Sequence, residues 1–202
     1  SFELAGQVGE PLTGRHFVMT LLPVALAESG LGVYDLRNRL EDFLIYGCYP
    51  EVLLAETPEK RTRILQELLS SYLYKDILAL DKVRSPAKLR DLARAIALQT
   101  GNDVSLGELA STVGLDAKTV ARYLDVLEKM FVIKRVGGLS RNLRSEISSK
   151  ARYFFLDTGV RNAVLDAFQP LSLRADIGGL WENFVFAELY KASMRGRHLS
   201  DI

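Results

Sequence analysis

The sequence predicts a mainly α-helical protein with a small β component, in which a bundle of helices is followed by a winged helix-turn-helix. Apolar residues recur at helical spacing between residues 34 and 80, which indicates amphipathic helices. A further pair of helices is indicated between Ser105 and Phe131, with a turn at Gly114. Strand-like runs follow at 131–136 and 152–156, and two strands after a helix-turn-helix make a winged helix.

The first half of the chain is predicted to form helices separated by loops. Residues 2–8 have a short helical pattern, and residues 17–22 form a strand-like run. An amphipathic helix is expected at 34–45, followed by a stop signal of Gly and Pro residues. Thr57 and Pro58 are a good cap and a favoured first helical residue, so the longest helix is expected to run from there to about residue 80.

The predicted helix-turn-helix carries a capping signal at the start of each helix. A helix at 86–100 precedes it. Ser105 and Glu108 have the spacing of a capping box, and Gly114 can supply the left-handed end of that helix. Asp116 is placed to cap the next helix, whose apolar residues repeat at helical spacing and would pack on its neighbour: Val120, Leu124, Leu127 and Phe131.

The segment after the helix pair is predicted to be a basic hairpin followed by two helices. The connection between the two strand-like runs would form the wing, where basic side chains can meet a phosphate backbone. Asp157 is expected to cap a short helix at 160–165, residues 168–179 are loop-like, and a last helix is expected from residue 180 to about 194.

The composition is that of an ordinary globular protein. The chain has 202 residues, of which 48% are hydrophobic and 25% charged, so it can bury a sizeable core. No apolar run approaches the roughly 20 residues that span a bilayer, and no signal peptide is apparent, so we expect a cytoplasmic protein without a membrane partner. Cys48 is expected to be a small buried hydrophobe, and two distant His residues give no metal-ligand spacing.

The net charge of +1 is unevenly spread along the chain. Residues 87–155 hold 12 Lys and Arg against 7 Asp and Glu, a net charge of +5. The predicted winged helix therefore carries the positive charge, which is a modest footprint for nucleic-acid binding.

The beginning and the end of the chain both favour a piece of a larger protein. The chain starts at Ser1 without a Met, and Ile202 follows shortly after a helix-like segment. Gly9 and Gly14 have the spacing of a phosphate-binding loop, but Arg15 and the following His replace the Lys and the Ser or Thr that such a loop needs. The sequence therefore contains no P-loop.

A series of short motifs resembles the C-terminal part of a widespread prokaryotic AAA-type ATPase family. In that family a nucleotide-binding core is followed by a helical lid, a winged helix and a restriction-endonuclease-like domain. The similarity covers nearly the whole chain, and besides the helix-turn-helix it is carried by Tyr-Gly-Cys-Tyr-Pro-Glu-Val (46–52), Tyr-Leu-Tyr-Lys-Asp-Ile (72–77), Leu-Ser-Arg-Asn-Leu-Arg (139–144), Tyr-Phe-Phe-Leu-Asp-Thr-Gly-Val-Arg-Asn (153–162) and Trp-Glu-Asn-Phe-Val-Phe-Ala-Glu-Leu (181–189).

The resemblance implies a division of the chain into four parts. Residues 1–30 would be the tail of the ATPase core, 31–84 a helical, lid-like bundle, 85–157 the winged helix-turn-helix, and 158–202 the truncated start of the endonuclease-like domain. The parent protein would bind ATP and Mg²⁺ through Walker A and Walker B segments ahead of Ser1. This chain would then be a non-catalytic fragment that holds no cofactor and no metal.

Two residues are candidates for catalysis in the parent protein. By the resemblance, Arg15 stands where related ATPases place an arginine finger that acts on a neighbouring subunit, although a plain surface arginine fits the same position. Glu182 matches an acidic residue on the first helix of the endonuclease-like domain. One carboxylate cannot hold Mg²⁺ alone, and an exposed residue near a helix start is the alternative interpretation.

Two functions of the winged helix are left open by the sequence. In the first it binds DNA and couples nucleotide state to that binding. Bases would be contacted by Lys118, Thr119 and Arg122, with Tyr123 also facing outward, and phosphates by Arg141, Arg144, Lys150 and Arg152. In the second it is a protein-interaction module that docks on the missing ATPase core or on a neighbouring subunit of a homo-oligomer, without DNA.

Overall fold

The computed structural model describes residues 21–71, 85–137 and 150–195. Within these residues the protein is mainly helical with one small antiparallel sheet, which confirms the predicted class at this level. The elements are η1 (Leu26–Glu28), α2 (Val33–Asn38), α3 (Leu40–Tyr46), α4 (Pro50–Leu53), α5 (Pro58–Leu68), α7 (Pro86–Leu98), α8 (Leu106–Val113), α9 (Ala117–Lys129), β1 (Ile133–Gly137), β2 (Ala151–Phe155), α11 (Thr158–Leu165), η3 (Leu171–Leu173) and α12 (Ile177–Met194).

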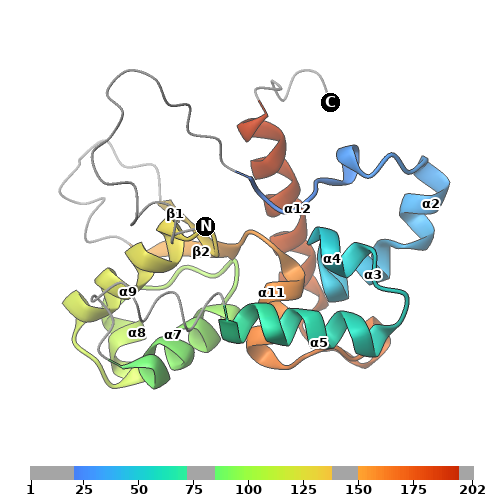
Figure 1. Ribbon diagram of the computed structural model, residues 1–202. Helices are drawn as coiled ribbons and strands as arrows, with labels where there is room; N and C mark the ends of the chain where they lie inside the picture. The colour runs from blue at the N-terminus through green and yellow to red at the C-terminus, as the bar shows by residue number, and fades with distance from the viewer. Residues whose placement is uncertain (1–20, 72–84, 138–149, 196–202) are drawn as a thin grey trace, which may run out of the picture.

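Figure 1 shows two groups of elements with α11 between them. Helices α7, α8 and α9 and the two strands form one group, and α2 to α5 form the other. Helix α11 contacts α3 and α5 in one group and α7 and β2 in the other. Helix α12 stands against α3, α11 and β2. Because α11 has neighbours in both groups, it is the central element of the fold.

The helix expected at 34–45 is interrupted once. Arg39 has φ −100° and ψ 6°, and this residue separates α2 from α3. Gly47, with a φ of +71°, ends α3, and Pro50 opens the short helix α4. The stop signals that the sequence predicted after residue 45 are therefore confirmed.

The long helix is described over its first half. Thr57 accepts a hydrogen bond from the Lys60 amide at 3.3 Å, and Pro58 is the first helical residue of α5, as predicted. Helix α5 ends at Leu68, and residues 69–71 form a wider π-type turn. The expected continuation to residue 80 lies outside the described residues, as does the helix expected at 2–8. Residues 21–22, the described end of the expected strand at 17–22, are not in a strand.

The helices of the predicted helix-turn-helix begin and end where their capping signals indicated. Ser105 and Glu108 form a capping box, in which each side chain accepts a hydrogen bond from the other's amide. Gly114, with φ 66° and ψ 47°, ends α8 in the left-handed conformation. Asp116 caps α9, and Ser85 caps α7 ahead of the pair. These local signals are confirmed because side-chain caps act within three residues of the helix start.

The sheet consists of β1 and β2 in antiparallel register. Ile133 lies opposite Phe155, and Gly137 lies opposite Ala151. Ala151 also forms a bridge with Val104, which ties the sheet to the loop ahead of α8. The connection at 138–149 lies outside the described residues, and with it the shape of the expected wing.

The last two helices follow the hairpin as predicted, with earlier starts. Asp157 caps α11, whose first residue is Thr158 rather than Val160. The expected loop at 168–179 contains η3 and the first turn of α12, so the last helix starts at Ile177 rather than at residue 180. Gly178 and Gly179 in that turn weakened the helical signal in the sequence.

The buried side chains form one large core and one smaller cluster. The large core runs from α3 and α5 through α7, α8 and α9 to the sheet and α11. The smaller cluster consists of Phe43, Leu44, Cys48, Leu180 and Phe184, where α12 meets α3. Cys48 is buried as predicted, and burial raises the pKa of its thiol to about 12. Among the described helices, none is both long and apolar enough to cross a membrane.

Candidate functional site

The exposed side of α9 near its start, which we call the α9 face, carries Lys118, Thr119 and Arg122. Lys118 and Arg122 are exposed, and neither forms an ion pair with a residue that the structure describes. The Arg122 guanidinium lies 5.7 Å from the centre of the Tyr123 ring. Both cations are therefore available to an anionic partner.

Thr119 serves the cap of its own helix. Its amide donates to Asp116 Oδ1 at 2.9 Å, and its hydroxyl donates to Asp116 Oδ2 at 2.7 Å. These bonds to Thr119 lower the pKa of Asp116, because they stabilise the charged carboxylate. A base contact by the Thr119 hydroxyl would have to compete with this cap.

Tyr123 faces the core, so its predicted outward orientation is wrong. Its side chain is 1% exposed, and its hydroxyl accepts a hydrogen bond from the Ser85 amide at 3.3 Å. The physical reason is helical spacing: Tyr123 lies three residues after Val120 and four before Leu127, both fully buried, and shares their face of α9. Tyr123 therefore fixes the start of α7 and does not contribute to the α9 face.

Lys150 and Arg152, the predicted phosphate contacts that the structure describes, are both paired with acidic residues. Lys150 Nζ lies 3.4 Å from a Glu108 carboxylate oxygen. Arg152 Nε donates to Asp103 Oδ1 at 3.0 Å, and a second guanidinium nitrogen lies 3.7 Å from Glu182. The bond to Asp103 raises the pKa of Arg152. Phosphate binding by either residue would have to displace an acid that already neutralises it.

Three predicted site residues, Arg15, Arg141 and Arg144, lie outside the described residues. Glu182 lies on α12 and pairs with Arg152. In the described part of the chain, no three His, Cys, Asp or Glu side chains come close enough to hold a metal ion. The structure therefore gives Glu182 the role of an ion-pair partner at the base of β2.

Side chains of α11 cap the end of α3. The Thr158 hydroxyl donates to the Phe43 carbonyl at 2.8 Å. Asn162 Nδ2 donates to the carbonyls of Leu44 and Ile45 at 3.0 and 2.8 Å. The Phe43 carbonyl also accepts from the Gly47 amide at 3.0 Å, whereas the last carbonyls of a helix lack partners within the helix and here receive them from Asn162. We call this contact the α3–α11 junction.

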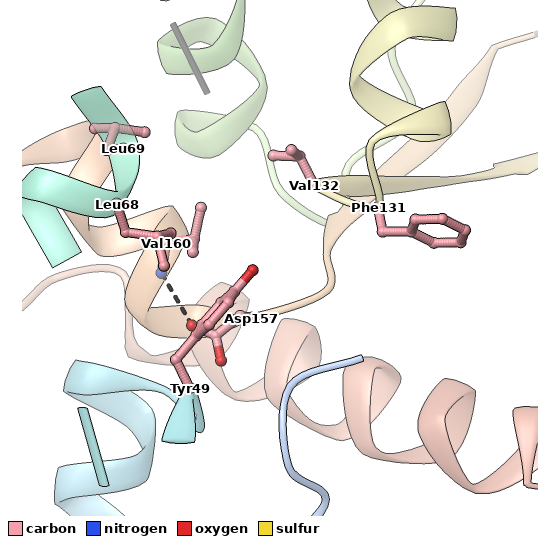
Figure 2. A pocket seen from close by; sticks show the side chains of 7 residues that line it. All are labelled: Tyr49, Leu68, Leu69, Phe131, Val132, Asp157 and Val160. Atoms are coloured by element: carbon pink, nitrogen blue, oxygen red, sulfur yellow. Dashed lines mark hydrogen bonds between the residues drawn. The ribbon is translucent and has the colours of Figure 1, made fainter. Parts of the chain in front are cut away.

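Two glycines allow the backbones to meet closely at the junction. A Cβ atom on Gly47 would lie 2.1 Å from Asp157 Oδ1, and one on Gly159 would lie 2.0 Å from the Tyr46 carbonyl oxygen. Asp157 is buried and accepts hydrogen bonds from the amides of Cys48 at 2.7 Å and Val160 at 3.0 Å. Figure 2 shows the Asp157 carboxylate beside the Tyr49 ring, with its bond to Val160. Burial raises the pKa of Asp157, against the effect of these bonds and of the nearby Lys191 charge.

A buried polar network links the junction to α7 and to the start of α12. Arg161 is 2% exposed; it donates to the Thr100 hydroxyl at 3.2 Å and to Asp176 at 2.8 Å. Arg174 also donates to Asp176 at 2.8 Å and to Asn162 Oδ1 at 3.0 Å. The two arginines, with the Arg174 bond as the largest cause, lower the pKa of Asp176 to about 2.

A last polar contact joins α12 to the sheet. Asn183 is fully buried, and its side chain accepts from the Phe155 amide at 2.8 Å and donates to the Phe155 carbonyl at 2.9 Å. Through these contacts α11 and α12 hold α3, α7 and β2 in fixed positions. The arrangement connects the two groups of elements through buried hydrogen bonds.

Sequence reasoning found the motifs that build the junction but not their role. Residues 46–52, 153–162 and 181–189 were noticed for their resemblance to a family. In the structure these three segments meet one another. One feature of the sequence could have indicated this role. In the run from Asp157 to Asn162, polar residues directly follow an apolar strand.

Comparison with known proteins places the chain in a family. Residues 37–171 match a family described as a domain of unknown function, DUF8612. The chain belongs to the DUF8612 family. An uncharacterized protein of Haemophilus influenzae is 26% identical over 199 residues, which cover 93% of this chain and 48% of that protein. One of Mycobacterium tuberculosis is 27% identical over 191 residues, covering 93% and 42%.

A third relative, from Methanocaldococcus jannaschii, is 21% identical over 204 residues, covering 92% of this chain and 44% of the relative. The chain thus spans less than half the length of these curated relatives. No solved structure matches the chain.

Proposed function

We propose that this DUF8612 chain is the non-catalytic C-terminal part of an AAA-type ATPase whose winged helix-turn-helix is a protein-interaction module. The module docks on the ATPase core or on a neighbouring subunit and couples its nucleotide state to the rest of the chain. ATP and Mg²⁺ belong to the parent protein in this proposal. The length of the relatives supports it, because more than half of each lies outside the matching region and can hold an ATPase core.

The observation that carries the proposal is the α3–α11 junction with its polar network. Asn162 and Arg161 are 0% and 2% exposed, and each bonds to a different group of elements, to α3 carbonyls and to Thr100 after α7. Breaking such bonds leaves buried polar groups without partners, at about 1–3 kcal/mol each. The two groups therefore move together, which is the property that a coupling module needs.

The charges on the α9 face suit a docking surface of limited size. Lys118 and Arg122, which form no ion pair within the described parts of the chain, fit a small acidic patch on a protein partner. A DNA duplex instead calls for roughly six or more phosphate contacts for tight binding, and Lys150 and Arg152 are already paired with acids. Asp125 and Glu128 on the same helix pair with Lys129 and Lys134, so these two lysines add no net positive charge to this side of the molecule.

DNA binding is the second candidate, and the position of Lys118 and Arg122 favours it. Both lie in the first two turns of α9, where recognition helices contact bases. With the wing arginines Arg141 and Arg144, they would form the contact set that the sequence predicts.

One pair of variants decides between the candidates. Lys118→Ala with Arg122→Ala removes both cations of the α9 face, and Lys60→Ala with Arg63→Ala is the matched control on the exposed side of α5. In size-exclusion chromatography with separately expressed ATPase core and ATP, we expect the wild type and the control to co-elute with the core, and the α9 variant to elute alone. Separate elution of the wild type contradicts docking.

The same proteins are titrated into a fluorescein-labelled DNA duplex, and anisotropy is followed at several salt concentrations. If docking is the function, none of them binds at low salt. Wild-type binding that weakens steeply with salt, and that the α9 variant loses, would establish the DNA candidate instead.

A further inference from the structure

The segment 21–28, which we call the strap, crosses α12 and the end of α3 and is held largely by polar contacts. The Val24 amide donates to the Cys48 carbonyl at 2.9 Å. Lys191 Nζ on α12 donates to the Val24 carbonyl at 3.1 Å, and Glu188 Oε2 accepts from the Leu26 amide at 2.8 Å. Side chains of α12 thus replace the backbone partners that a neighbouring strand would supply.

Glu188 and Lys191 form a buried pair. Lys191 is 4% exposed and donates to Glu188 Oε1 at 2.8 Å, with 19% of the Glu188 side chain exposed. Burial alone would lower the pKa of Lys191, but the adjacent charges, that of Glu188 foremost, raise it. Desolvating an ion pair is costly unless its remaining donors and acceptors also form hydrogen bonds. Here Lys191 donates to the Val24 carbonyl and Glu188 accepts from the Leu26 amide, both in the strap.

The strap is loosely packed on both sides at its beginning. Leu21, Leu22 and Pro23 line a cavity of about 280 Å³ next to Arg195, and the same three residues line a second cavity of about 300 Å³ next to Phe131. Leu21 is 89% exposed, whereas Pro23 and Ala25 are buried and Val24 and Leu26 pack against the smaller cluster. The beginning of the strap has few buried apolar contacts, and such segments open at a lower free energy than the core around them.

Besides the pair of Glu28 with Arg195 at 3.3 Å, the contacts of the strap with Cys48 and with α12 connect it to the rest of the molecule. Cys48 accepts from Val24 through its carbonyl and donates to Asp157 through its amide, so one residue separates the strap from the α3–α11 junction. Helix α12 continues from Glu188 back to Asn183, which holds the sheet. The strap is therefore separated from α11 by Cys48 alone and from β2 by one stretch of α12.

We propose that the strap is a movable element and that Glu188 and Lys191 are the latch that holds it on α12. Opening of the latch releases Val24 and Leu26 while the α3–α11 junction stays closed. This device stands on contacts within the described residues and does not depend on the partner of the α9 face.

Hydrogen exchange of the intact chain, read by mass spectrometry, tests the latch. Lys191→Met and Glu188→Ala are each expected to speed amide exchange in peptides covering 21–31 about tenfold, with exchange in α8 and α9 unchanged. Lys129→Met is the matched control, because it removes a lysine that pairs with Asp125 at 2.8 Å on the exposed surface of α9. Unchanged strap exchange in both variants overturns the proposal, as does an equal increase throughout the chain.

The double variant Glu188→Met with Lys191→Met separates a latch from a merely structural ion pair. Replacing both charges with apolar groups is expected to recover the melting temperature that either single variant loses, because no charge remains buried alone. The Leu26 amide and the Val24 carbonyl still lack their side-chain partners, so amide exchange in the strap stays fast. Recovery of slow strap exchange together with the melting temperature would reject the latch.

Discussion

At the scale of single residues, Gly47 has the most demanding position in the junction. It combines φ +71° with ψ −159°, a region that side chains rarely enter. Its missing Cβ leaves room for the Asp157 carboxylate, which bonds to the next residue, Cys48. The positive φ and the lack of room for a Cβ atom both require glycine at this position. The sequence could indicate only the requirement for a positive φ.

We therefore expect Gly47→Ala to lower the free energy of unfolding by at least about 3 kcal/mol, from backbone strain and from the clash with Asp157. Gly30→Ala is the control, since Gly30 also has a positive φ, +69°, but open space around it. Gly30→Ala should lower the free energy of unfolding by only about 1 kcal/mol. Urea denaturation measures both, and equal losses would show that the contact with Asp157 does not matter.

At the scale of elements, Asp176 shows how tertiary contacts override a local role. It precedes α12, yet its side chain forms no cap there and accepts from Arg161 and Arg174 instead. Helix α12 is thereby fixed to α11 and to the buried arginines. The same residue makes the stability of this contact dependent on pH.

The pKa of Asp176 is about 2 in the folded protein against an ordinary value of 3.8. Because the folded-state pKa is the lower one, its stabilisation is complete above about pH 4 and is lost as the pH falls toward 2. The side chain is 40% exposed, so with solvent screening we expect Asp176→Asn to cost about 1 kcal/mol more at pH 6 than at pH 2.

Asp125→Asn, which removes an exposed carboxylate paired with Lys129, is the control for this pH dependence. Guanidinium titrations at the two pH values give the free energies. If Asp176→Asn lowers the free energy of unfolding equally at pH 6 and at pH 2, the lowered pKa of Asp176 is contradicted.

At the scale of the whole molecule, the continuous core predicts cooperative unfolding. The large core includes residues of α3, α5, α7, α8, α9 and α11, and Asn183 and Asp176 attach α12 to it. The large core contains residues on both sides of positions 84 and 157, at which the sequence resemblance divided the chain, and the smaller cluster lies between α12 and α3. That division stays a prediction about the longer parent protein.

Two probes can follow unfolding from different parts of the molecule. Trp181 on α12 is the only tryptophan of the sequence, and circular dichroism reports on all helices. We expect both signals to change in one coincident urea transition. Asn162→Leu should lower the free energy of unfolding by about 3 kcal/mol in both signals, because it leaves several buried groups without hydrogen bonds. Asn102→Leu, in an exposed loop, is the control and should change neither signal. An earlier Trp181 transition would mean that α12 unfolds separately.

The sequence by itself determined the helical class, the caps at Thr57, Ser105 and Asp116, and the end of α8 at Gly114. It could do so because caps and amphipathic spacing act over three or four neighbouring residues. It also placed Lys118 and Arg122 on the exposed side of α9.

The tertiary structure alone decided what the polar motifs contact. Tyr123 was expected to face outward because it lies near the start of the predicted recognition helix, but it is buried and bonds to Ser85 at the start of α7. Lys150 and Arg152 lose their free charge to acids that are distant in sequence, and Asn162 finds the end of a helix more than a hundred residues away. Such pairings depend on how α11 is placed between two groups of elements, and no local pattern encodes that placement.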